Sequence, residues 1–193
     1  MFEMRALKTT LRNTFHFGVL DTDDVNAFAA PGGYVLVTRG ALALMESEAE
    51  LAGVLAHEIG HVDQKHVLEE IRKSAVFKQA QDETDLQGAL MDRLSEVGTT
   101  LLFTGLSRED ELQADSLGLL YAAATGYRAD GMLDFLRHLR TAEGANSGGL
   151  REWVATHPST DERIQGVERQ LAGRPFGGAD GAACFRSSVR RQP

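Results

Sequence analysis

Cysteine is nearly absent from the sequence: Cys184 is the one cysteine among 193 residues. A single thiol excludes an internal disulfide and a cysteine-based zinc site. Positive charge is also scarce, because 20 lysines and arginines face 28 aspartates and glutamates and give a net charge of -8. Nucleic-acid binding needs a basic face, and so does charge-driven binding to anionic lipid. Both classes of protein are therefore disfavoured.

Long hydrophobic runs are missing as well. No apolar stretch approaches the roughly 18 residues that span a bilayer, and the first twenty residues do not resemble a signal peptide. The segment 75–104 carries charges from Lys78 to Glu96, so we expect a lid or flank of a functional site there and no membrane span. The composition is that of a globular protein. We predict a single domain over residues 1–172 and a poorly ordered tail over 173–193.

The periodicity predicts a mainly helical α+β protein with a small sheet. Residues 26–40 read as strand, turn and strand, with the turn at Pro31-Gly32-Gly33. The capping pair Ser47 and Glu50 opens a helix that we expect to run into the low seventies. Further helices are predicted over residues 1–20, from about Ser107 to Ala124, around 132–139, and after a second capping pair at Ser159 and Glu162.

The first helix after the hairpin carries the motif His57-Glu58-Ile59-Gly60-His61, an HExxH pattern. Residues four apart lie about 40° apart around a helix, so His57 and His61 present two imidazoles to one point. Glu58 lies beside them, suited to act as a general base and not as a ligand. The pattern arises by chance in roughly one chain in a hundred of this composition. Its place inside a capped apolar helix favours a catalytic metal site.

His66 follows closely, but it does not fit the same site. If the helix continues, His66 points about 140° away from His61 and about 180° away from His57. We therefore interpret His66 as scaffold. A metzincin is also excluded, because Gln64 and Val67 occupy the positions where that motif requires glycine and histidine. A third ligand must come from elsewhere in the chain.

The segment SREDELQAD, residues 107–115, is the best source of that ligand. Of its four carboxylates, Glu111 and Asp115 are four residues apart and share a helix face, whereas Glu109 and Asp110 point elsewhere. With Glu111 as a ligand, Asp115 one turn later could accept the outer N–H of a ligand histidine. Taken alone, the segment would read as a solvated acidic face. An HExxH motif without its third ligand favours the site.

These motifs together resemble the HtpX-like zinc metalloendopeptidases, a gluzincin-type family that includes the CAAX prenyl protease. SREDELQAD matches the family pattern SRxxExxAD, NAFAAPGG resembles its NAFAxPGG strand, and THPSTDERI its HPxxxxRI segment. The matches run in order from about residue 26 to residue 164. The resemblance implies a zincin-like domain with a small sheet beside the HExxH helix. It also implies a soluble branch of the family in the periplasm or cell envelope, without a transmembrane segment, peripheral at most to a membrane.

The resemblance also implies a role for each matching residue and one Zn²⁺ per chain. Arg163 is interpreted as a structural partner of an acidic side chain. The implied zinc ligands are His57, His61 and Glu111, the general base and acid is Glu58, the residue that orients a ligand histidine is Asp115, and the residues near the reacting carbonyl are Asn26 and His157.

We therefore expect an endopeptidase that cleaves unfolded, misfolded or envelope polypeptides, with a role in protein quality control. The strand formed by Tyr34, Val35, Leu36 and Val37 is predicted to bind extended substrate by strand addition. His157 has a second candidate role as a fourth zinc ligand in a latent state. The alternatives are a holdase that keeps the metal site for structure, and a hydrolase that uses another divalent ion.

Overall fold

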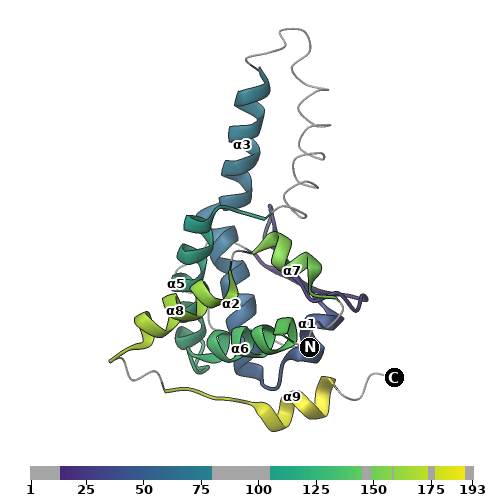
Figure 1. Ribbon diagram of the computed structural model, residues 1–193, viewed down its shortest axis with the longest axis vertical. Coiled ribbons are helices and arrows are strands. Elements are labelled where there is room, and N and C mark those ends of the chain that lie inside the picture. Colours follow the sequence, from purple (N-terminus) through teal and green to yellow (C-terminus); the bar gives the residue numbers. More distant parts are fainter. Residues whose placement is uncertain (1–13, 80–104, 145–148, 158, 174–176, 190–193) are drawn as a thin grey trace.

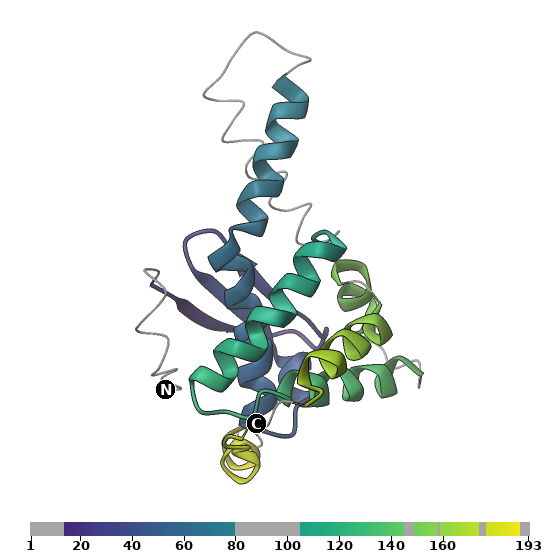
Figure 2. The ribbon, with the colours of Figure 1, turned by 90° about the vertical axis from the view of Figure 1, so that its left-hand side faces the viewer.

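The computed structural model describes residues 14–79, 105–144, 149–157, 159–173 and 177–189, and these form a mainly helical α+β fold (Figures 1 and 2). The sheet consists of β1 (His16–Leu20), β2 (Ala27–Ala30) and β3 (Tyr34–Thr38). The helices are α1 (Arg39–Leu44), α2 (Glu48–Gln64), α3 (His66–Gln79), α5 (Arg108–Ala124), α6 (Gly131–Gly144), α7 (Arg151–Thr156), α8 (Thr160–Leu171) and α9 (Ala182–Val189). The fold class expected from the sequence is confirmed.

The predicted strand–turn–strand is present as β2 and β3, which pair antiparallel. Gly32 and Gly33 both adopt positive φ in the turn, a conformation that glycine reaches without strain. The predicted helix over residues 1–20 is wrong for residues 16–20, because these form β1 and pair in parallel with β3. Pairing with a distant strand overrides the local helical pattern here.

The helix predicted from Ser47 is interrupted at Lys65. Ser47 caps α2 by accepting the Glu50 N–H, as the capping pair predicted. Lys65 then takes a left-handed conformation, φ 60° and ψ 30°, and its N–H bonds back to the carbonyls of His61 and Val62. The chain restarts as α3 at His66, and α3 projects away from the other described helices in both views (Figures 1 and 2). The interruption changes the direction of every side chain after it.

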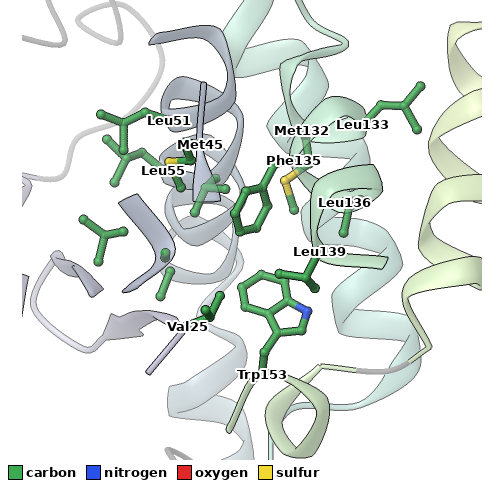
Figure 3. Close-up of a cluster of buried hydrophobic side chains, with 14 of the residues drawn as sticks. Val25, Met45, Leu51, Leu55, Met132, Leu133, Phe135, Leu136, Leu139 and Trp153 are labelled. Atoms are coloured by element: carbon green, nitrogen blue, oxygen red, sulfur yellow. The ribbon is translucent and has the colours of Figure 1, made fainter. Parts of the chain in front are cut away.

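The core surrounds α2, which contacts α5, α6, the sheet and α9. Its buried aromatic side chains include Phe135 of α6 and Trp153 of α7, which meet edge to face with ring centroids 5.4 Å apart (Figure 3). The sequence did not predict α7, and the tail expected over 173–193 is wrong for α9. Phe185 of α9 is 3% exposed and belongs to the same hydrophobic cluster. Burial of this aromatic ring stabilises the short helix against the core.

Close contact between α2 and two other helices depends on glycine. A Cβ at Gly118 of α5 would lie 3.2 Å from the backbone N of His57, and a Cβ at Gly60 would lie 3.2 Å from Cα of Ala114. A Cβ at Gly53 would lie 2.5 Å from the backbone N of Met132 in α6. The absence of side chains brings α5 against the part of α2 that carries the HExxH motif.

We expect Gly53→Ala to lower the free energy of unfolding by about 1–3 kcal/mol, because the added methyl group pushes α6 away from α2. Gly144→Ala at the end of α6 is the matched control, since a Cβ there meets no atom within 4 Å. Chemical denaturation of the two variants measures the difference. Equal stability of the two variants would show that α6 can move away from α2 without a loss of stability.

Two sequence predictions lie partly or wholly outside the described residues. These are the lid or flank assigned to 75–104, of which 80–104 are not described, and the domain limits at the N-terminus. Among the described helices, none combines the length and the apolar content needed to cross a bilayer.

Candidate metal centre

Two imidazoles from α2 and one carboxylate from α5 meet in the interior. His57 and His61 are one helical turn apart, and their Nε2 atoms lie 3.1 Å from each other. Glu111 approaches from α5, with Oε2 3.5 Å from His57 Nε2 and Oε1 3.3 Å from His61 Nε2. All three side chains are at most 3% exposed. The structure thus brings together the three ligands predicted from the sequence.

The spacing of these atoms fits a tetrahedral metal ion. Ligand atoms about 2.0–2.1 Å from a tetrahedral zinc ion lie about 3.3–3.4 Å from one another. The two imidazole nitrogens are 3.1 Å apart, and each has a different oxygen of Glu111 near it, at 3.3 Å from His61 and 3.5 Å from His57, so all three spacings are close to that value. Glu111 Oε2 also has no hydrogen-bond partner among the described residues although it is buried. A buried carboxylate oxygen without a donor is stabilised by a cation.

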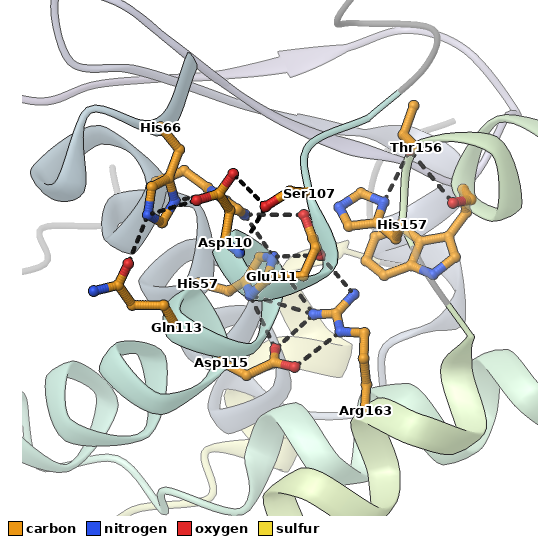
Figure 4. Close-up of polar contacts among 12 residues, drawn as sticks. His57, His66, Ser107, Asp110, Glu111, Gln113, Asp115, Thr156, His157 and Arg163 are labelled. Atoms are coloured by element: carbon orange, nitrogen blue, oxygen red, sulfur yellow. Dashed lines mark hydrogen bonds and ion pairs between the residues drawn. The ribbon is translucent and has the colours of Figure 1, made fainter. Parts of the chain in front are cut away.

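Asp115 lies behind His57, one turn after Glu111. Its Oδ1 is 3.0 Å from His57 Nδ1, so Nδ1–H can donate to the carboxylate and leave Nε2 free to bind a metal. The same carboxylate accepts two hydrogen bonds from Arg163 of α8, from Nε at 3.0 Å and from Nη2 at 2.7 Å (Figure 4). Burial opposes ionisation of Asp115, but Arg163 and His57 more than offset it and lower its pKa to about 2.

The buried carboxylates outnumber the buried guanidinium. Three carboxylates, Glu58, Glu111 and Asp115, surround one guanidinium, that of Arg163, all at most 2% exposed. With the carboxylates ionised and the histidines neutral, two negative charges are in excess, and a divalent ion would neutralise them. Without a metal ion, this excess of negative charge favours the protonated form of His57. Burial and Arg163 oppose its charged form, yet the nearby carboxylates of Asp115 and Glu111 raise its pKa to about 9. A metal ion replaces that proton.

Glu58 borders the metal centre, and one of its two carboxylate oxygens makes no hydrogen bond to the described residues. It lines a pocket with His61, Glu111 and His157, and its Oε1 is buried with no hydrogen-bond partner among the described residues. Burial raises the pKa of Glu58 to about 7, and His57 only partly opposes this effect. A carboxylate with a pKa near neutrality can both take up and release a proton.

His157 reaches the same pocket from the end of α7. His57, Glu111 and His157 each offer a ligand atom within 4.8 Å of the other two. The His157 ring stacks on Trp153, with centroids 4.0 Å apart and planes 13° apart, and its Nδ1 lies 2.8 Å from Thr156 Oγ1. Burial lowers the pKa of His157 to about 3, so the ring is neutral and has a lone pair to offer.

Asn26 and the predicted substrate strand are the two remaining site elements predicted from the sequence. Asn26 is fully buried just before β2, where its Oδ1 accepts the Ala27 N–H, while its Nδ2 has no partner among the described residues. The predicted substrate strand, Tyr34 to Val37, is wrong as an edge for strand addition. It belongs to β3, the central strand, which is hydrogen-bonded to β1 on one side and β2 on the other.

Sequence reasoning also missed the contacts of His66 and the size of the Arg163 network. His66 Nδ1 lies 2.9 Å from His61 Nδ1, because the interruption at Lys65 redirects α3. No glycine or proline marks that interruption in the sequence. The predicted structural pairing of Arg163 with an acidic side chain is present, with Asp115 as the partner. The second predicted capping pair does not form, since Glu162 binds Arg108 instead.

Comparison with known proteins gives the same picture. The model of peptidase family M48 matches residues 3–171. Mitochondrial metalloendopeptidase OMA1 of Schizosaccharomyces pombe is 34% identical over 150 residues, which are 76% of this chain and 43% of that protein. The beta-barrel assembly-enhancing protease of Escherichia coli is 28% identical over 169 residues, or 80% of this chain and 34% of that protein.

A third relative is closer in length. Metalloprotease YcaL of Escherichia coli is 28% identical over 174 residues, which cover 87% of this chain and 67% of that protein. The chain spans less than half of the OMA1 and assembly-enhancing proteins. The resemblance drawn from the motifs is confirmed, because the family model covers the hairpin, both halves of the metal centre and α8. The chain belongs to peptidase family M48, a family of metallopeptidases.

Proposed function

We propose that the protein is a zinc-dependent endopeptidase that hydrolyses peptide bonds of unfolded or misfolded polypeptides in the cell envelope. The observation that carries the proposal is the buried convergence of His57, His61 and Glu111, with Glu58 beside them. Two imidazoles and one carboxylate leave a fourth position for water or substrate, as catalytic zinc sites do. The relatives are named metalloendopeptidase, metalloprotease and assembly-enhancing protease, which favours a polypeptide substrate and an envelope location.

In the proposed mechanism, the protein's side chains move the protons and hold the reacting groups. A zinc ion held by His57, His61 and Glu111 would supply Lewis acidity, which would make water easier to deprotonate and would polarise the peptide carbonyl. Glu58 takes a proton from the attacking water and returns it to the leaving amine. Asp115 holds His57 with Nε2 directed at the ligand position. The unpartnered Nδ2 of Asn26 is a candidate donor to the developing oxyanion.

We place the substrate along β2 and no longer along β3. β2 pairs with β3 on one side, and its other edge has no strand partner among the described residues. Ala27, Phe28 and Ala29 of β2 line the pocket that holds Glu58 and His61. An extended peptide added to this edge would lie across the base. Main-chain pairing favours cleavage within a chain with loose sequence preference.

For His157 we propose the role of a fourth ligand in a latent state. Thr156 Oγ1 donates to the Trp153 carbonyl at 3.4 Å, so its oxygen can accept from His157 Nδ1–H at 2.8 Å. This tautomer leaves the Nε2 lone pair free, as ligation requires. The stack on Trp153 fixes the ring plane. Substrate must then displace His157 before hydrolysis.

The proposed activity is tested by digestion of unfolded casein. We expect cleavage by the purified protein, loss of cleavage after treatment with a zinc chelator, and recovery when zinc is restored. Elemental analysis should give one zinc per chain. Cleavage that survives complete removal of the metal would contradict the proposal, and recovery with another divalent ion alone would assign a different metal.

The latent state predicts that His157→Ala is more active than the wild type. The gain equals the inverse of the open fraction, about tenfold when one molecule in ten is open. Initial rates on a quenched fluorescent casein measure it. His16→Ala is a control, since His16 lies in β1 and stacks on Tyr34 away from the described pocket. A lower rate in His157→Ala would instead assign the ring to transition-state stabilisation.

A further inference from the structure

The two histidines of the metal centre differ in what holds their outer nitrogen. His57 Nδ1 faces the Asp115 carboxylate at 3.0 Å, the common arrangement for a ligand histidine. His61 Nδ1 faces no carboxylate within hydrogen-bond distance among the described residues. Its partner is Nδ1 of His66, at 2.9 Å. We propose that His66, backed by Gln113, positions His61 for metal binding. The inference rests on the proposed metal site.

The hydrogen bonds that link His61, His66 and Gln113 can be assigned in one consistent direction. A metal on His61 Nε2 requires the proton of that ring on Nδ1, which donates to His66 Nδ1. His66 must then carry its own proton on Nε2, and this nitrogen lies 2.9 Å from Gln113 Oε1 (Figure 4). Gln113 in turn donates from Nε2 to Gln64 Oε1 at 3.4 Å. Each donor meets an acceptor from the ligand ring to the surface.

The fold places His66 there by two independent features. The left-handed Lys65 ends α2 and turns the first residue of α3 back over the last turn of α2. Across the interface, α5 brings Gln113 two residues after Glu111, so the helix that supplies a ligand also supplies the support. His66 is 6% exposed, and Asp110 Oδ1 lies 3.5 Å from its Nε2 as a second acceptor. A buried ring with both nitrogens paired has a fixed orientation.

The side chains that support His57 and His61 differ in charge. Asp115 is a carboxylate and also binds Arg163, whereas His66 is a neutral acceptor on the other side of the centre. A neutral acceptor fixes the tautomer and plane of His61 without adding a fourth negative charge to the three buried carboxylates. His66 is therefore a positioning residue: it acts through His61 and does not contact the reacting atoms.

Zinc affinity, measured by competition with a chromophoric chelator, tests the inference without reference to activity. His66→Phe keeps the ring volume but removes the acceptor, and we expect it to bind zinc about 10–100-fold more weakly than the wild type. His66→Asn places an oxygen near the position of Nδ1, and we expect it to recover most of the affinity. A packing role predicts the opposite order, because asparagine leaves a cavity that phenylalanine fills.

A second readout and two further variants complete the test. In the cobalt-substituted protein, His66→Phe should change the visible d–d spectrum and His66→Asn should restore it. Gln113→Ala, at an exposed position, should lower zinc affinity by a smaller factor with no effect on folding. His138→Phe is the matched control, because it removes a histidine that bonds to Glu50 at 3.0 Å, away from the metal centre.

The outcomes separate this inference from the proposed function. Weaker zinc binding in the order wild type, His66→Asn, His66→Phe supports it. Wild-type affinity in His66→Phe, or weaker binding by His66→Asn than by His66→Phe, overturns it. A wild-type protein that binds no zinc overturns the proposed function instead.

Discussion

Glu58→Gln is expected to abolish proteolysis while the protein keeps its metal. Removal of a general base costs about 10²–10⁴-fold in rate, and glutamine cannot accept the proton of the attacking water. The fold should tolerate the change, because Glu58 Oε1 makes no hydrogen bond among the described residues and the two side chains have nearly the same shape. The rate on unfolded casein and the zinc content of the same preparation measure the two effects.

Glu109→Gln is the matched control for this variant. It makes the same chemical change at an exposed carboxylate in the first turn of α5, two residues before Glu111. We expect wild-type activity from it. Substantial activity in Glu58→Gln would falsify the assignment of the base, whereas inactivity of the wild type itself would favour the holdase alternative.

Arg163→Met is expected to destabilise the protein by about 3–5 kcal/mol, because it leaves a buried ion pair without its cation. Arg163 is fully buried and donates two hydrogen bonds to Asp115, and its Nη1 lies 3.6 Å from Glu111 Oε2. Its guanidinium carbon also sits 5.5 Å from the centre of the Trp153 ring. Loss of the arginine exposes Asp115 and Glu111 to each other's charge. Denaturation by urea of the metal-free protein measures the change.

Arg137→Met is the control for Arg163→Met. Arg137 binds Glu168 at 2.9 Å, but both side chains are about half exposed, so the pair contributes about 1 kcal/mol or less. The double variant Asp115→Leu with Arg163→Met should recover part of the lost stability, since no charge of the pair remains buried. If the double variant recovers no stability, Arg163 acts mainly through Glu111 or Trp153.

The elements with strong local signals were predicted well. The Gly-rich turn fixed the β2–β3 hairpin through its positive φ angles, Ser47 caps α2 as predicted, and α5 begins directly after Ser107, near its predicted start. Elements held by distant contacts were not. β1 forms because it pairs with the edge of β3, and α9 is held because Phe185 packs into the core. Local propensity contains neither of these contacts.

The candidate site shows the same division. Helical geometry alone paired His57 with His61 and Glu111 with Asp115, because a spacing of four residues puts two side chains on one face. The same geometry misplaced His66, since it assumed a straight helix through Lys65. Side-chain composition selected β3 as the substrate strand, but composition does not reveal which strand lies at an edge of the sheet.

The sequence by itself therefore determined the family, and it predicted the two halves of the candidate metal centre and the base between them, since each depends on residues close together in the chain. Only the tertiary structure decided what completes the centre. Packing α2 against α5 at Gly60 and Gly118 brings Glu111 to the two histidines, and α7 and α8 add His157 and Arg163. Helix crossings set these contacts, a single left-handed residue sets the contact of His66 with His61, and both features depend on the whole core.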